Sequence, residues 1–250
     1  MTLLSAKNAG HRYGPRYGCR DVSFDLFPGE VLAVVGESGS GKSTLLGTLA
    51  GRLSLSEGSV HYGPRDLAGL SESELRRLWR TEWGFVHQNP ADGLRMTVSA
   101  GANVGERLMA VGDRHYGKIR ATAVDWLSRV EIDEDRIDDE PRAFSGGMRQ
   151  RLQIARNLVT GPRLVFMDEP TGGLDVSVQA RLLDLLRGLV TDLGLAAIVV
   201  THDLAVARLL SQRMMVMKDG RVVESGLTDR VLDDPRAPYT QLLVSSILQV

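Results

Sequence analysis

Residues 36–43 read GESGSGKS, and this stretch decides the fold. It matches the pattern G-x-x-x-x-G-K-[ST], in which a glycine-rich loop joins a buried strand to a helix. The five residues before it, VLAVV, are aliphatic and mostly β-branched, as in a strand buried on both faces. Residues 42–50 after it have helical character. We therefore predict a strand, a phosphate-binding loop and a helix in succession.

The composition of this loop suits a phosphate ligand. Glycines let the backbone approach closely, so that N–H groups point at phosphate oxygens, and the helix N-terminus adds a positive field. Lys42 is expected to bridge the β- and γ-phosphates, and Ser43 to offer its hydroxyl to Mg²⁺. The chain has only four lysines, at positions 7, 42, 118 and 218, against 26 arginines. A chance match of the motif is therefore less common, because one of these few lysines stands at the lysine position of the pattern.

A second stretch, residues 164–170 (LVFMDEP), predicts the other side of a phosphate site. Its apolar run is expected to be a buried strand that ends in a carboxylate, at the edge where open α/β sheets bind ligands. Asp168 is expected to hold Mg²⁺ through water, and Glu169 to polarise a water for in-line attack on the γ-phosphate. Alone, such a run could be an ordinary strand end, but here it follows a phosphate loop in the same chain.

Residues 145–150 (SGGMRQ) lie between these stretches and precede a helix. Ser145 suits an ordinary helix N-cap. The same geometry could instead offer backbone N–H groups and a helix dipole to a phosphate. Both interpretations stay open from these residues alone.

Strand and helix patterns alternate along much of the chain. We predict strands at residues 22–27, 31–35, 164–167 and 196–200, and helices at 42–50, 71–80, 176–189 and 204–210. Such alternation indicates a parallel sheet with helices packed outside it. Residues 89–159 differ, because helical spacing recurs at 104–111, 119–130 and 148–159 without a predicted strand. We expect this stretch to be a helical insertion.

Composition excludes several classes of protein. The net charge of -1 argues against a nucleic-acid binder that works by bulk charge. Cys19 is the single cysteine and cannot form an internal disulfide. The N-terminus lacks a signal-peptide layout, and the aliphatic runs fall far short of the roughly 20 residues that cross a bilayer, so we expect a soluble, cytoplasmic protein without direct membrane insertion. The seven carboxylates of residues 131–140 predict a solvated loop rather than a metal site, and Met214, Met215 and Met217 predict a packed strand.

Taken in order, these motifs resemble those of the ATP-binding-cassette (ABC) ATPases over nearly the whole chain. The resemblance identifies residues 36–43 as Walker A, 144–150 as the signature motif, 164–170 as Walker B and 172–175 as the D-loop. It gives Gln88 as the Q-loop glutamine, His202 as the switch histidine and Tyr13 as the aromatic that stacks on adenine, with Tyr17 as a nearby alternative. The implied fold is an α/β P-loop NTPase, one nucleotide-binding domain over residues 1–250. It would have a mostly parallel sheet core, an N-terminal antiparallel β part and a helical subdomain at 89–159 that includes the signature helix.

The resemblance also implies Mg²⁺-dependent ATP hydrolysis by a head-to-tail homodimer. The implied catalytic residues are Lys42, Gln88, Glu169 and His202, and the implied Mg²⁺ ligands are Ser43, Gln88 and Asp168. ATP would lie on Tyr13 and on the loop residues Gly36, Glu37, Ser38, Gly39, Ser40, Gly41, Lys42, Ser43 and Thr44. Ser145 and Gly147 of the second copy would close over the γ-phosphate.

Two positions depart from the family pattern. Met148 stands where the signature motif usually has glutamine, and Gly172-Gly173 stands where the D-loop usually has small residues such as Ser-Ala. Ser145 and Gly147 are retained, so ATP binding is expected to survive. These departures bear on the coupling between the two sites of a dimer.

A narrower resemblance is to the ATP-binding K subunits of bacterial carbon–phosphorus lyase systems. It rests on residues 80–90, 92–95, 98–101, 107–110, 168–190, 224–234 and 239–246. It implies a soluble enzyme core as partner, in which ATP turnover drives opening or remodelling of the complex that cleaves phosphonate C–P bonds.

Two other classes remain as alternatives. The first is the motor of an importer for dipeptides, oligopeptides or nickel, which shares the Tyr-Thr-Gln ending at residues 239–241. Such importers usually continue further and often carry a cysteine cluster, whereas this chain stops at Val250 with one cysteine, so the lyase partner is favoured. The second is a regulatory cassette that binds ATP without turnover, which Glu169 and His202 disfavour.

Overall fold

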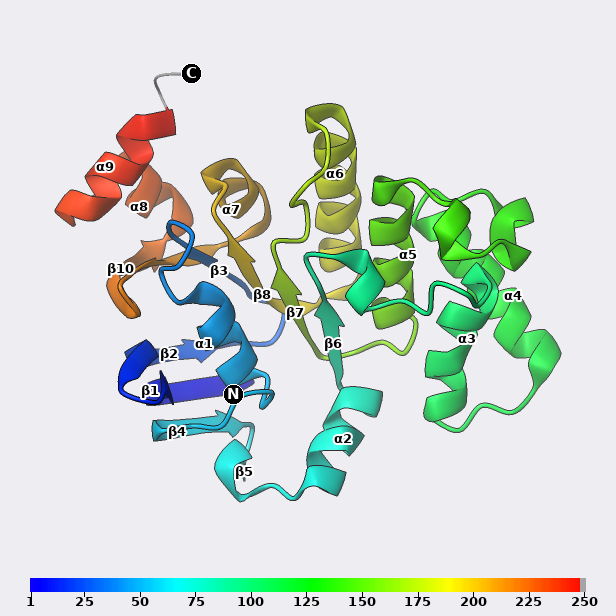
Figure 1. Ribbon diagram of the computed structural model, residues 1–250, viewed down its shortest axis with the longest axis horizontal. Coiled ribbons are helices and arrows are strands. Elements are labelled where there is room, and N and C mark those ends of the chain that lie inside the picture. The colour runs from blue at the N-terminus through cyan, green and yellow to red at the C-terminus, as the bar shows by residue number, and fades with distance from the viewer. Residues whose placement is uncertain (248–250) are drawn as a thin grey trace. The chain divides into compact units, whose positions relative to one another are not determined.

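The computed structural model describes residues 1–247, and these form two compact units (Figure 1). The first unit comprises residues 1–75 and the chain from residue 194 onward, and the second comprises residues 76–193. The predicted helical subdomain at 89–159 falls inside the second unit, which is wider because it also contains two strands, a further helix at residues 176–193 and most of the helix at residues 72–81. The single-domain organisation and its limits stay predictions.

The N-terminal part of the first unit is an antiparallel sheet, as predicted. Its strand order is β2-β1-β4-β5, and its strands are β1 (Leu4–Tyr13), β2 (Arg16–Leu26), β4 (Glu57–Tyr62) and β5 (Arg65–Asp66). Strand β2 starts six residues before the predicted strand, because its first half pairs with β1 down to Tyr13 opposite Arg16. The sequence of β1 mixes small and polar residues, so its pattern did not predict a strand.

The rest of the first unit contains the predicted parallel pairing. Strand β3 (Val31–Val35) is buried at all five positions and runs parallel to both β8 (Ala196–Thr201) and β9 (Arg213–Lys218). Strand β10 (Arg221–Leu227) pairs antiparallel with β9. The methionines at 214, 215 and 217 are buried in β9, which confirms that they pack a strand. The helices of this unit are α1 (Lys42–Leu49), α7 (Leu204–Leu210), α8 (Thr228–Asp233) and α9 (Pro238–Ile247), and the start of α2 (Glu72–Thr81).

The second unit is mostly helical. Its strands β6 (Trp83–Val86) and β7 (Leu164–Asp168) pair in parallel, and residues 89–159 between them contain no strand, as predicted. Besides most of α2, its helices are α3 (Ala100–Ala110), α4 (Tyr116–Arg129), α5 (Gly146–Leu158) and α6 (Val176–Leu193), with 3-10 turns at Pro90–Asp92, Glu134–Asp138 and Pro141–Ala143. An aromatic cluster packs on β6 and β7, where the rings of Trp83 and Phe166 lie edge to face at 5.4 Å. Helix α6 continues four residues beyond its predicted end.

The acidic stretch 131–140 is not purely a loop, because it contains the 3-10 turn Glu134–Asp138. Its carboxylates pair with neighbouring arginines: Asp138 with Arg120 at 2.7 Å, and Glu131 with Arg151 at 2.9 Å. Local ion pairs therefore account for much of this charge. No helix within residues 1–247 has both the length and the apolar character to cross a bilayer.

Candidate functional site

The glycine-rich loop between β3 and α1 is held closely by its neighbours. Gly36, Gly39 and Gly41 have φ angles of 151°, 82° and 100°, a region that favours glycine. A Cβ at Gly41 would lie 2.2 Å from the carbonyl oxygen of Gly18, and one at Gly36 would lie 2.3 Å from that of Met217. Larger residues are therefore excluded at these two positions by backbone atoms.

Lys42 and the start of α1 make this loop suited to an anion. The Lys42 side chain is 6% exposed, and its Nζ donates to the carbonyl oxygens of Gly36 at 2.7 Å and Glu37 at 2.9 Å. No side chain caps the N-terminus of α1, so a ligand can accept hydrogen bonds from its first N–H groups. The buried Ser40 hydroxyl also has no hydrogen-bond partner among the described residues. This arrangement fits a polyphosphate chain.

Two tyrosines lie near the loop, and they differ in how much of the ring other side chains cover. The ring of Tyr17 lies under the guanidinium groups of Arg12 and Arg20, and its hydroxyl donates to Glu57 at 3.2 Å. Tyr13 is 55% exposed. Its ring and the Thr44 side chain would both meet a Cβ at Gly18, at 2.9 and 2.6 Å. Tyr13 is thus the more exposed of the two tyrosines, although the His11 ring packs edge to face against it at 4.5 Å.

His202 belongs to the same unit as the loop. Val35 of β3 is the register partner of Thr201 of β8. Gly36 and His202 therefore follow the ends of two adjacent parallel strands, and His202 is exposed. Asp203 holds the next turn by capping α7, where its Oδ1 accepts from Ala205 N at 2.8 Å. The first unit thus presents Tyr13, residues 36–44 and His202.

Strands β6 and β7 bring a second set of candidates together. Val86 is the register partner of Met167, so Gln88 and Asp168 both emerge at the carboxyl ends of adjacent parallel strands, where α/β sheets bind ligands. Glu169 has a φ of 45°, a conformation that costs energy for a residue with a side chain and that clusters at functional sites. Its carbonyl oxygen accepts from Gly172 N at 2.9 Å, which closes the turn after β7.

The start of α5 has the N-cap geometry expected from the sequence. The hydroxyl of Ser145 accepts from Met148 N at 3.3 Å. Gly147 packs against α6, since a Cβ there would lie 2.5 Å from Val178 Cγ1. The capping interpretation is confirmed, and it leaves the phosphate-binding one as a prediction.

Both departures from the family pattern have a local explanation. The sulfur of Met148 accepts from Arg136 Nη1 at 3.6 Å, so this side chain is turned to a neighbouring arginine. Gly173 has a φ of 73°, which favours glycine, and a Cβ there would meet nothing within 4 Å. A Cβ at Gly172 would lie 3.3 Å from Gln88 Nε2, so this glycine lets Gln88 lie close.

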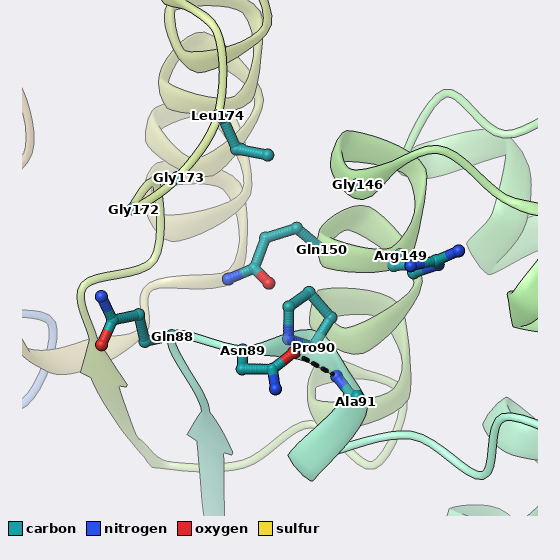
Figure 2. A pocket seen from close by; sticks show the side chains of 10 residues that line it. All are labelled: Gln88, Asn89, Pro90, Ala91, Gly146, Arg149, Gln150, Gly172, Gly173 and Leu174. Atoms are coloured by element: carbon teal, nitrogen blue, oxygen red, sulfur yellow. Dashed lines mark hydrogen bonds between the residues drawn. The ribbon is translucent and has the colours of Figure 1, made fainter.

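A pocket of about 390 Å³ in the second unit is lined by residues from three of the predicted motifs. Figure 2 shows Gln150 extending from α5 toward the side where Gln88 and Gly172 lie. The pocket is lined by Gln88, Asn89, Pro90, Ala91, Gly146, Arg149, Gln150, Gly172, Gly173 and Leu174. The Q-loop, the signature helix and the D-loop are therefore neighbours within this unit.

Buried amides of α5 fix these loops, and sequence reasoning missed them. Gln150 is 2% exposed, and its Nε2 donates to the carbonyl oxygens of Pro170 at 2.8 Å and His87 at 3.2 Å. Gln153 is fully buried, and its Oε1 accepts from His87 N at 2.6 Å. Asn157 Oδ1 accepts from Phe85 N at 2.9 Å. The signal available in the sequence is an amide at spacing i, i+3, i+7 on one helix face.

Comparisons with known proteins identify the family of the chain. The profile of the family described as "ABC transporter" matches residues 19–172. The phosphonates utilization ATP-binding protein PhnK of Escherichia coli (strain K12) is 70% identical over 99% of this chain and 98% of its own length. The oligopeptide transport ATP-binding protein OppD of Bacillus subtilis (strain 168) is 37% identical over 91% of this chain and 66% of its own. A solved dimer of the ATP-binding cassette MJ0796, in a post-hydrolysis state with ADP and Pi, has a TM-score of 0.81 at 31% identity, covering 90% of this chain and 99% of that one.

Proposed function

This chain belongs to the ABC transporter family and is an ATPase of the ABC type, and from that premise we propose that its ATP hydrolysis serves organic phosphonate catabolism. In this proposal a dimer of the chain drives a conformational change in a soluble carbon–phosphorus lyase core complex in the cytoplasm. The observation that carries the proposal is the 70% identity to PhnK, which extends over 98% of that protein.

The first unit would bind the nucleotide. Tyr13 would stack on adenine, and residues 36–44 would hold the phosphates, with N–H groups from within this stretch as donors. Lys42 would turn from the two loop carbonyls that it now contacts to the β- and γ-phosphates. His202, which follows the strand beside the loop, would contact the γ-phosphate and respond to its loss.

The second unit would supply the groups for attack. Glu169 would orient the water, because a carboxylate in line with the γ-phosphate can accept its proton. Gln88 and Asp168 of this unit, and Ser43 of the first unit, carry oxygen ligands of the kind that Mg²⁺ prefers. When bound, this ion would neutralise charge on the transferring phosphoryl group. Phosphoryl transfer needs positioning and charge stabilisation more than covalent chemistry, and these residues are of the right types for both.

A second copy would complete each site. Ser145 and Gly147 at the N-terminus of α5 would close over the γ-phosphate bound to the other copy, so that turnover waits for dimer closure. The dimeric state of the MJ0796 cassette supports this arrangement. A Glu169→Gln variant, which would hold ATP without turnover, should have the sedimentation mass of a dimer, twice 27.3 kDa, in ATP and that of a 27.3 kDa monomer in ADP. A monomer in both nucleotides would refute the shared site.

The proposal also names a partner protein, a subunit of the lyase core complex. Helices within 89–159 follow Gln88 directly and are the candidate docking face for a lyase subunit, whose movement would depend on the γ-phosphate. The test is affinity capture of the chain from cells that grow on a phosphonate as phosphorus source, with identification of the co-purified proteins. We expect soluble lyase subunits. Capture of membrane permease subunits alone would favour the importer function, which the similarity to OppD suggests at lower identity.

A further inference from the structure

The C-terminal helix α9 reaches the phosphate loop through one side chain. Glu37 N donates to the phenolic oxygen of Tyr239 at 3.1 Å, across 202 positions of sequence. The Glu37 carbonyl oxygen in turn accepts from Lys42 Nζ at 2.9 Å and from Ser40 N at 3.2 Å. Tyr239, the Glu37 residue and the Lys42 ammonium therefore form one continuous set of contacts within the first unit.

Tyr239 is itself held in place by its surroundings. The ammonium of Lys218 lies 4.9 Å from the centre of its ring, a cation–π contact that favours one ring position. With Leu243 and Val244, Tyr239 packs against a buried apolar cluster that includes Ala33 and Val35 of β3. Strand β3 leads directly into the loop, so α9 touches the loop and its supporting strand together.

The N-terminus of α9 is fixed by a carboxylate of β10. Glu224 accepts from Arg236 N and Ala237 N, each at 2.9 Å. Burial alone would raise the pKa of Glu224, but the nearby Thr240 hydroxyl and the hydrogen bonds from these two N–H groups outweigh it and lower the pKa. The ionised carboxylate is thus the form that holds the start of the helix against β10.

We propose that Tyr239 is a positioning residue for the phosphate loop, through which the docking of α9 sets the affinity for nucleotide. Its hydroxyl fixes the Glu37 peptide, which is part of the loop and also accepts from Ser40 N. A glycine-rich loop loses much conformational freedom when a ligand orders it. A contact that orders the loop beforehand lowers this cost, and so tightens binding. This inference rests on the proposed role of residues 36–44 in binding ATP.

The opposite rim of the loop has a different support. Gly220 N, in the turn between β9 and β10, donates to the Ser40 carbonyl oxygen at 2.9 Å, and Arg20 N donates to Gly220 O at 2.8 Å. These are backbone bonds that no side-chain substitution removes. Loss of the Tyr239 hydroxyl should therefore loosen one rim while the loop as a whole persists.

The test is Tyr239→Phe, which keeps the ring, its packing and its contact with Lys218 but removes the hydrogen-bond acceptor. Since one such bond is worth about 1 kcal/mol, we expect ATP and ADP to bind about fivefold more weakly. The value of kcat at saturating ATP should not change, and the Glu37 amide should exchange its hydrogen faster. The matched control is Tyr116→Phe on α4, where the side chain is 74% exposed and the same group is lost. It should bind nucleotide as the unmodified chain does.

A Lys42→Ala variant separates this inference from the proposed function. If Lys42→Ala loses nucleotide binding while Tyr239→Phe binds normally, the role of Tyr239 is refuted and the proposed function stands. If Lys42→Ala binds normally, both are refuted. A Tyr239→Phe variant that loses kcat and melting temperature together, without faster exchange at Glu37, would show a merely structural role and would also overturn the inference.

Discussion

Gln150→Leu tests whether the buried amides of α5 hold the loops of the second unit. The substitution keeps a similar volume but removes three hydrogen bonds, to Pro170 O, to His87 O and from Gln153 Nε2. His87 O keeps its bond from Gln153 Nε2 at 3.1 Å, whereas Pro170 O loses its buried donor. Three hydrogen bonds contribute about 3 kcal/mol net to stability, and burial of the apolar leucine side chain offsets part of their loss. We therefore expect a loss of about 2 kcal/mol in the free energy of unfolding.

The assay is urea unfolding followed by tryptophan fluorescence, since all three tryptophans, at positions 79, 83 and 126, lie in the second unit. The matched control is Gln241→Leu on α9, where an exposed glutamine makes one bond, at 3.0 Å to Pro235 O. It should change stability by less than about 0.5 kcal/mol. A Gln150→Leu variant as stable as this control would refute the role of the buried amide.

Gln150→Glu sharpens the same prediction through pH. The variant keeps the shape but sets a carboxylate against the carbonyl oxygens of Pro170 and His87, and burial beside these acceptors should raise its pKa in the folded state. A raised folded pKa means that stability is complete at low pH and is lost as pH rises through that pKa. The gap in urea midpoint between Gln150→Glu and the unmodified chain should thus widen from acid to neutral pH. A gap independent of pH would contradict this account.

Three further predictions concern the first unit. Gly41→Ala should abolish nucleotide binding, because its Cβ would lie 2.2 Å from Gly18 O. Gly39→Ala has open space at its Cβ and should cost only about 1 kcal/mol of backbone strain. Equal nucleotide affinities of the two variants in a fluorescent-nucleotide titration would contradict this prediction. The lowered pKa of Glu224 means that its stabilisation is present above the unfolded-state pKa and is lost as pH falls through the folded one, so Glu224→Gln should flatten the acid limb of a urea-midpoint-against-pH curve. Burial raises the pKa of the Cys19 thiol. A disulfide reagent should therefore label Cys19 in urea but hardly at all in the folded chain at neutral pH. Fast labelling of the folded chain would refute the burial of this thiol.

The elements that sequence predicted best are those with a strong local pattern. The all-aliphatic run of β3 and the glycine loop after it need only neighbouring residues to be recognised, and the methionines of β9 pack as expected. Strand β6 was missed because WGFV is four residues long and follows a helix without a turn signal. Strand β10 was missed because Ser225 and Gly226 interrupt its alternation.

Contacts between distant segments could not be predicted from one sequence. Gln150 and Gln153 look like a polar helix face, and the segments that follow β6 and β7 supply the partners that bury it. The bond from Glu37 to Tyr239 spans 202 positions and has no local signature. The difference between Tyr13 and Tyr17 likewise depends on contacts that have no local signature, since the guanidinium groups of Arg12 and Arg20 lie over the Tyr17 ring.

ATP turnover by Glu169→Gln, measured beside its ATP binding, tests the central claim most directly. That claim is that this chain hydrolyses ATP with Glu169 orienting the attacking water. We predict an ATP affinity within about twofold of the unmodified chain and a kcat lowered by about 10²- to 10⁴-fold, the usual contribution of a general base. Hydrolysis at an unchanged rate, with ATP binding intact, would contradict the claim.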